Sequence, residues 1–324
     1  MFKRNSQIFF ILSLFFGANS FAEESDHSQF PDIRLAFEIL DIMKENVITK
    51  ENVDWLALHS DVQKIYDSGV KKPFYESVYK IFEKADTGHS FYSSLSNPKF
   101  IMHRKKSCKN SVFEFTEPPN GIGYIKISRF SNRHPLKKLE FVEDIRKQIK
   151  KHNNDDLKGW VVDLSDNSGG NMWPMLAGIA PLLNDGIHGY FDYPDGKKYS
   201  WSTQDGKSFT NGNFSIGFEE NLELNNTLPI AVISGGTTSS SGEALLITFK
   251  GKSNTRFFGH NSCGMSTANK TFKLSNGALL AVTTSTMMDS KFTSYGNEVK
   301  VDIETNSPYV EAVKWIELQS LSNL

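Results

Sequence analysis

The feature that most constrains the fold of this chain is a repeated order of buried strand, glycine-rich turn and helix in its second half. Residues 160–164 and 228–233 are short, mostly apolar runs, and each leads into a turn with paired glycines and then a helical pattern. Such runs are typical of strands buried on both faces of a sheet. The order of strand, helix and strand predicts an α/β fold, and 324 residues are enough to bury a substantial core.

The part of the chain before these strands has a different pattern. Apolar residues recur every three or four positions at Ile33, Phe37, Leu40 and Met43, which is one face of a helix, and a second helical pattern ends at Phe82. We therefore predict an N-terminal helical domain over residues 23–92. The polar residues 93–119 are predicted to be a linker, and residues 120–324 to form the α/β domain. An Asn-Gly pair at 276–277 predicts a β-hairpin.

The first 22 residues have the pattern of a secretory signal peptide. Lys3 and Arg4 precede an apolar run over residues 8–17, and Ser20-Phe21-Ala22 has the small residues of a cleavage site. This run is well short of the roughly 20 residues that cross a bilayer. The sequence thus predicts an exported protein, periplasmic or extracellular, with no stable membrane insertion after the signal is cleaved.

Charge and cysteine content exclude several classes of function. Thirty-six basic and 37 acidic residues give no basic face for nucleic acid. Neither a His-Glu-x-x-His nor a Cys-x-x-Cys spacing occurs, so we predict no metal and no cofactor. In an oxidising compartment Cys108 and Cys263 can pair or remain two buried thiols. The sequence leaves both states open.

Two glycine-containing turns could carry chemistry. Residues 234–242 follow a buried strand and lead into a helix, so Ser240 is expected at the free N–H groups of a helix start. There it could act as a nucleophile beside an anion-stabilising site, or simply cap the helix. Gly169 and Gly170 follow the other buried strand and could be part of the same site or an ordinary tight turn. His89 lies in a tight loop after a helix, but a lone histidine needs a partner before it indicates catalysis.

Taken in order, six segments resemble the tail-specific (C-terminal processing) serine peptidase family. They are VDWLAL from residue 53, ADTGHSF from 85, GIGYIKISRF from 121, DLSDNSGG from 163, PIAVISGGTTSSSGEAL from 229 and SNGALLAVTTS from 275. The resemblance covers about residues 30–316. It implies a crotonase/ClpP-like core of ββα units preceded by helices.

The resemblance also implies roles for individual residues. The family nucleophile is the serine of Ser-x-x-Glu, which is Ser240 here, with oxyanion donors from Gly169 or Gly170 and from the N–H of Ser241. The processing branch has a lysine base where this chain has Met265. The chain is therefore more similar to the tricorn-type branch, in which a histidine is the base, and His89 fits that role.

Three further details bear on this assignment. The spacing from Asp86 to His89 is one residue longer than the resemblance implies, and Gly88 occupies the position of a serine that precedes the histidine in the tricorn-type tetrad. Glu243 and Glu298 are the candidate carboxylates that could orient the histidine, although Glu243 would also suit the first turn of a helix. About 30 polar residues between His89 and the α/β domain are too few for the PDZ module of tail-specific members.

These observations predict an exported serine peptidase that acts on peptides or unfolded proteins. Ser240 would attack the scissile carbonyl and His89 would accept its proton. The alternative is a catalytically silent protein that binds peptides or small ligands on the same fold. The sequence does not determine the oligomeric state.

Overall fold

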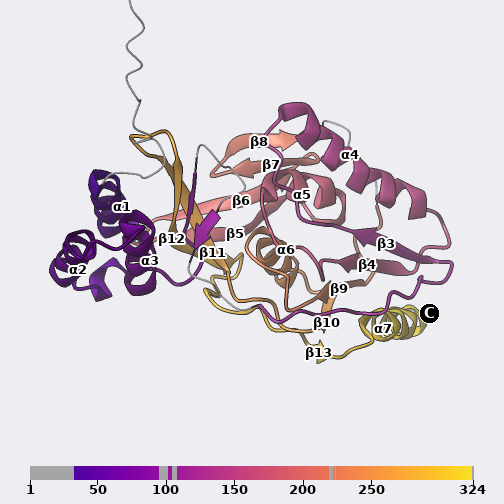
Figure 1. The fold of residues 1–324 in the computed structure, drawn as a ribbon. Helices are drawn as coiled ribbons and strands as arrows, with labels where there is room; N and C mark the ends of the chain where they lie inside the picture. The colour runs from indigo at the N-terminus through magenta and orange to yellow at the C-terminus, as the bar shows by residue number, and fades with distance from the viewer. Residues whose placement is uncertain (1–32, 95–100, 104–107, 219–221, 223, 323–324) are drawn as a thin grey trace, which may run out of the picture.

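The computed structural model describes residues 33–94, 101–103, 108–218, 222 and 224–322 (Figure 1). The predicted signal peptide lies outside the described residues. Among the helices that are described, none is both long and apolar enough to cross a membrane.

A five-stranded parallel sheet forms the centre of the α/β region. Its strand order is β13-β10-β9-β4-β3, and every neighbouring pair is parallel. The strands are β3 (Ile122–Lys126), β4 (Gly159–Asp163), β9 (Ile230–Ser234), β10 (Thr255–Gly259) and β13 (Ile303–Glu304). The runs at 160–164 and 228–233 correspond to β4 and β9, which are adjacent, so the turns that follow them meet at one edge of the sheet.

Helices cover both faces of this sheet. They are α4 (Pro135–His152), α5 (Met172–Ile179), α6 (Ser241–Lys250) and α7 (Pro308–Ser322). Alternation along β4 sends Trp160 and Val162 into the core shared with α5 and α6, while Val161 joins the core shared with α7. The whole of β4 is buried, as expected for a central parallel strand.

The second sheet has eight strands and is antiparallel. Its order is β2-β1-β12-β5-β6-β7-β8, with β11 paired to β12. Trp201 of β6 and Met287 of β12 share one hydrophobic core with α5 and α6, which therefore lie between the two sheets. The strands are β1 (Phe91–Ser93), β2 (Ile101–His103), β5 (Gly186–Asp192), β6 (Lys198–Gln204), β7 (Lys207–Thr210), β8 (Asn213–Gly217), β11 (Thr267–Lys273) and β12 (Leu279–Asp289).

The N-terminal helices are present, and they complete their core with a distant hairpin. Helices α1 (Ile33–Asn46), α2 (Trp55–Asp67) and α3 (Pro73–Ala85) pack on Leu274, Leu280 and Val282 of the β11–β12 hairpin. Figure 1 shows the three helices grouped beside this hairpin. The predicted class, α/β with N-terminal helices, is confirmed, and the Asn-Gly hairpin lies where it was expected.

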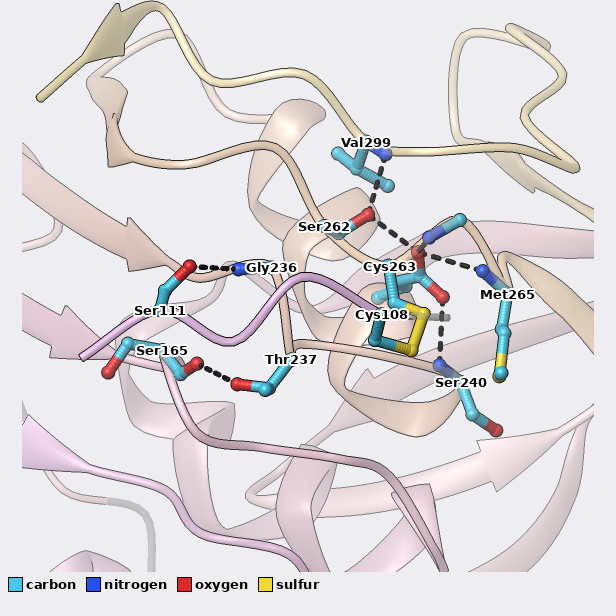
Figure 2. Close-up of a disulfide and its surroundings, with 12 residues drawn as sticks. Cys108, Ser111, Ser165, Gly236, Thr237, Ser240, Ser262, Cys263, Met265 and Val299 are labelled. Carbon is cyan, nitrogen blue, oxygen red and sulfur yellow. Dashed lines mark hydrogen bonds between the residues drawn. A yellow bond between two sulfur atoms is a disulfide. The ribbon is translucent and has the colours of Figure 1, made fainter. Parts of the chain in front are cut away.

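The described part of the predicted linker packs against the protein. Strand β2 of this segment pairs with β1, which ends at Ser93, the first residue of the predicted linker, and β1 pairs with β12. Residues 108–115, here called the strap, continue along the parallel sheet, where Phe113 lies against its core. In the strap, Ser111 accepts a hydrogen bond from the N–H of Gly236, which follows β9 (2.8 Å; Figure 2). The strap therefore crosses the edge of the sheet where the glycine-rich turns lie.

Candidate active site

Ser240 stands between β9 and α6, immediately before the first residue of the helix. Its backbone has φ +53° and ψ −117°, a region that non-glycine residues seldom adopt and that is common at functional sites. Ser240 is half-buried, whereas Ser239 and Ser241 on either side are buried. The turn thus presents one hydroxyl of the serine run to the site.

The loop between α3 and β1 brings His89 to this serine. His89 Nε2 lies 3.0 Å from Ser240 Oγ, across 151 positions of sequence. Asp86 shapes the loop, because its buried carboxylate accepts hydrogen bonds from the N–H groups of Gly88 and Ser90 and from the Ser90 hydroxyl. The longer Asp86-to-His89 spacing therefore still places the imidazole within hydrogen-bonding distance of Ser240.

Strand β11 supplies the second partner of the imidazole. His89 Nδ1 lies 2.8 Å from the hydroxyl oxygen of Thr267, which is buried. Two positions further along, the Asn269 side-chain amide donates to the carbonyl of His89 at 2.8 Å. Sequence reasoning missed both residues. Their only signal was the alternation of polar residues along a strand, which does not say what the strand faces.

The glycine pair after β4 lies directly against Ser240. Gly169 has φ +90°, and a Cβ atom there would come 2.8 Å from the Cβ of Ser240, so both conformation and space require glycine. The N–H of Gly169 donates to the side-chain oxygen of Asn167 (2.9 Å). Gly169 therefore stabilises the turn, which argues against its predicted role as an oxyanion donor in this geometry.

The other two predicted donors differ from Gly169. Within the described residues, neither the N–H of Gly170 nor that of Ser241 donates a hydrogen bond to another protein atom. The two residues are joined by a bond from the Ser241 hydroxyl to the carbonyl of Gly170 at 2.7 Å. Ser241 is the first residue of α6, where N–H groups lack partners within the helix. These two N–H groups fit an anion-stabilising role best.

Asn167 holds the two glycine-containing turns together, and sequence analysis did not single it out. It is fully buried. Its backbone carbonyl accepts from the N–H of Ser239, and its side chain donates to the carbonyl of Ile127 at 3.0 Å. Because its side-chain oxygen also accepts from Gly169, Asn167 fixes the spacing between the glycine pair and the serine turn.

Glu243 is fully buried beneath the serine. Its carboxylate accepts hydrogen bonds from the N–H groups of Ser240 (2.8 Å), Gly264 (2.7 Å) and Met265 (3.1 Å) and from the hydroxyl of Ser262 (2.5 Å). Figure 2 shows these bonds. Burial raises the pKa of Glu243 to about 7, and the four donors oppose that rise because they favour the charged form.

The predicted orienting role of the two carboxylates needs correction. The hydrogen bonds of Glu243 go to backbone groups and to Ser262, so it supports the serine turn and the loop after β10. Glu298 is exposed. The two ring nitrogens of His89 instead face Ser240 and Thr267. A neutral hydroxyl, that of Thr267, thus takes the position beside the imidazole that a carboxylate was expected to occupy.

The two cysteines form a disulfide bond. Cys108 of the strap and Cys263 of the loop after β10 have Cα atoms 4.9 Å apart and are joined through their sulfur atoms (Figure 2). Of the two states that the sequence left open, the structure has the paired one. Met265, which stands where the resemblance would place a lysine, follows two residues later and is held through its N–H by Glu243.

Comparison with known proteins identifies the family. Residues 121–305, which include Ser240, the glycine pair and Thr267, match Peptidase family S41. The chain belongs to this family. The match confirms the resemblance to the tail-specific peptidases. Of the residues at this site, His89 lies before the matched stretch.

This S41 chain is similar to a known relative over most of its length. It is 28% identical to the nisin-resistance protein of Lactococcus lactis subsp. lactis over 283 residues, which is 84% of this chain and 86% of that protein.

Solved structures share the fold. A lipoprotein from Streptococcus agalactiae superposes with a TM-score of 0.70 at 24% identity, covering 90% of this chain and 98% of that one. A putative peptidase from Parabacteroides merdae gives 0.57 at 16% identity, covering 88% and 97%. The photosystem II D1 C-terminal processing protease gives 0.52 at 13% identity, covering 87% and 96%. This S41 chain thus has the fold of these proteins along nearly its full length.

Proposed function

We propose that this S41 chain is an exported serine peptidase in which Ser240 is the nucleophile and His89 is the general base. The observation that carries the proposal is the 3.0 Å separation of Ser240 Oγ and His89 Nε2 at the start of α6. A serine hydroxyl is a weak nucleophile until a base accepts its proton, and an imidazole at this distance can do so. The proposal therefore replaces the lysine base of the processing branch with a histidine.

Thr267 supports this assignment because its hydroxyl oxygen can accept a hydrogen bond from the Nδ1–H tautomer of His89. For Nε2 to accept a proton from Ser240, the ring hydrogen must be on Nδ1, where it can donate to the hydroxyl oxygen of Thr267. As Ser240 Oγ attacks the carbonyl carbon, Nε2 gains the proton and later donates it to the leaving amine. The carbonyl oxygen becomes negative, and in this proposal the N–H groups of Gly170 and Ser241 stabilise it.

The substrate class follows from the family and from the relatives. S41 is a peptidase family, so the substrate is a peptide or an unfolded protein. Similarity to a nisin-resistance protein and to a lipoprotein, together with the predicted signal peptide, supports action in the cell envelope or outside the cell. Nisin is accordingly the first peptide to test.

The test of this proposal is labelling with a serine-directed fluorophosphonate. We expect one label per chain of the mature protein, located on the peptide that contains Ser240, together with hydrolysis of at least one member of a panel of unstructured peptides. A folded protein that takes no label and cleaves no peptide would favour the catalytically silent binding protein.

A further prediction concerns Thr267. The change Thr267→Val keeps the size of the side chain but removes the oxygen beside Nδ1, so the imidazole loses its fixed tautomer and orientation. We expect kcat to fall by roughly 10-fold or more, with little change in KM. Thr267→Ser restores the hydroxyl and should recover most of the loss. Equal kcat in the valine variant and the unmodified protein would remove Thr267 from the mechanism.

A further inference from the structure

Five consecutive residues, 263–267, contact both halves of the proposed catalytic pair. They bond to Glu243, which holds the Ser240 turn, and to the imidazole of His89. The N–H groups of Gly264 and Met265 donate to the Glu243 carboxylate, which also accepts from the N–H of Ser240. Two residues beyond Met265, the hydroxyl of Thr267 lies 2.8 Å from His89 Nδ1. A shift of this short segment would therefore disturb the nucleophile and the base together. Here it is called the brace.

The brace is held at both ends, by a covalent bond at its first residue and by hydrogen bonds near its last. The N–H of Cys263 donates to the carbonyl of Thr238 at 2.8 Å, and its sulfur is bonded to Cys108, 155 positions away in sequence. At the other end, β11 begins at Thr267 and pairs with β12. Between these points the N–H groups of Gly264 and Met265 donate to the buried carboxylate of Glu243. Ser266 accepts at its carbonyl from the N–H groups of Met287 and Gly296, and its hydroxyl donates to the carbonyl of Asn297.

The strap to which the brace is bonded is itself fixed to the central sheet. Ser111 accepts from the N–H of Gly236 and lies 2.8 Å from His260 Nδ1, and His260 Nε2 lies 3.0 Å from the Asn306 side-chain oxygen. Phe113 packs in the core beside α7. The disulfide therefore connects the brace to a segment anchored on the parallel sheet, and Figure 2 shows the sulfur–sulfur bond between strap and brace, close to Ser240.

From these contacts we propose that the Cys108–Cys263 disulfide is a positioning element of the active site, and that its reduction lowers turnover by releasing the brace. The proposal rests on the proposed serine peptidase function. Both cysteines are half-buried, so a small thiol reagent can approach the bond. A dithiol reductant supplies two electrons and two protons. The protein then holds two cysteine thiols, and the reagent leaves as its own disulfide.

The effect on catalysis follows from the geometry that proton transfer requires. Reacting groups displaced by about 1 Å can lose on the order of 100-fold in rate. Reduction removes one covalent anchor but leaves the hydrogen bonds to Glu243 and those of Ser266, so we expect a smaller loss. Turnover should fall by about 10-fold, while KM changes little because the brace contacts Glu243 and His89, whose positions serve the chemical step.

The experiment compares the oxidised protein, the protein reduced by dithiothreitol, and the Cys108→Ser, Cys263→Ser and double variants, all below their melting temperatures. We expect the reduced protein and the three variants to share one lowered kcat, and reoxidation to restore the unmodified protein alone. The double variant should not respond to dithiothreitol. An unchanged kcat accompanied only by a lower melting temperature would overturn the proposal, because the bond would then stabilise the fold without positioning the site.

A second measurement separates this proposal from the proposed function. Amide hydrogen exchange reports on the N–H groups of Ser240, Gly264 and Met265 whether or not the protein hydrolyses peptides. We expect these amides to exchange faster after reduction, while amides in the central strand β4 do not change. If the oxidised protein cleaves no peptide and takes no fluorophosphonate, the peptidase assignment fails, and exchange still decides whether the disulfide positions the serine. Equal exchange at the three amides before and after reduction contradicts the proposal.

Discussion

Replacing Ser240 with alanine should lower peptide hydrolysis by on the order of 10³-fold or more and abolish fluorophosphonate labelling. The side-chain oxygen is the atom that would bond to the carbonyl carbon, and it lies 3.0 Å from His89 Nε2. The change removes one hydroxyl from a half-buried side chain, so the fold should persist. Initial rates on a cleaved peptide, together with intact-protein mass spectrometry after labelling, measure both effects.

Ser239 offers the matched control. It precedes Ser240 in the same turn and is buried. Its backbone N–H donates to the carbonyl of Asn167, a bond that alanine retains. Ser239→Ala should therefore keep turnover and labelling within a few-fold of the unmodified protein. If the Ser239 and Ser240 variants were equally active, the nucleophile would have to be found outside this turn.

Much of this site could be anticipated because its parts are local in sequence. A buried strand, a serine-rich turn and a helix start lie within about 15 residues of one another around Ser240, and the glycine pair follows the neighbouring strand in the same way. In a parallel sheet, turns that follow adjacent strands meet at the same edge. Because β4 and β9 are adjacent, that rule puts Gly169 beside Ser240.

The remaining parts depend on pairings that the sequence pattern does not encode. Thr267 reaches His89 only because β11 pairs with β12 and the α3–β1 loop crosses the same region. Polar residues on a strand look alike whether they face solvent or an imidazole. The strap was predicted to be part of a linker for the same reason, since its residues are mostly polar. In the structure its Ser111 bonds to Gly236 and to His260 in the loop after β10.

Replacing His89 with alanine should also reduce hydrolysis by on the order of 10³-fold, because no other described group lies where it could accept the Ser240 proton at the observed distance. A further expectation concerns the double variant. When a nucleophile and its base act as a unit, the first substitution removes nearly all of the rate enhancement that they provide. The Ser240→Ala, His89→Ala double variant should therefore be hardly slower than either single variant. Rates of all four proteins on one peptide complete this cycle.

The control for His89 must separate a missing base from a collapsed loop. Asp86, which shapes the loop, is untouched by the change, so the melting temperature should shift little. His89→Gln retains a polar side chain but lacks a basic nitrogen, and it should be as inactive as the alanine variant. Near-normal turnover in either variant, alongside an inactive Ser240→Ala protein, would mean that another group is the base.

The pH profile of hydrolysis also tests whether His89 is the general base, and its interpretation must include the titration of Glu243. A histidine base must be neutral, so hydrolysis should fall once the pH is low enough to protonate it. Burial raises the pKa of Glu243 to about 7, so its carboxylate also becomes protonated as the pH falls below neutral and can no longer accept from all four of its donors. Both ionisations lower activity in the same direction.

The variant Glu243→Gln shows which of the two groups causes the loss of hydrolysis at low pH. The glutamine does not titrate, and its amide nitrogen meets the N–H of Ser240 or of the brace, so the maximum kcat should fall. If histidine is the base, the variant keeps a decline toward low pH that fits a single ionisation, while the unmodified protein shows a steeper one. If the rate of hydrolysis by Glu243→Gln does not change below neutral pH, the whole decline in the unmodified protein is due to the buried carboxylate. That result would contradict the assignment of His89 as the base.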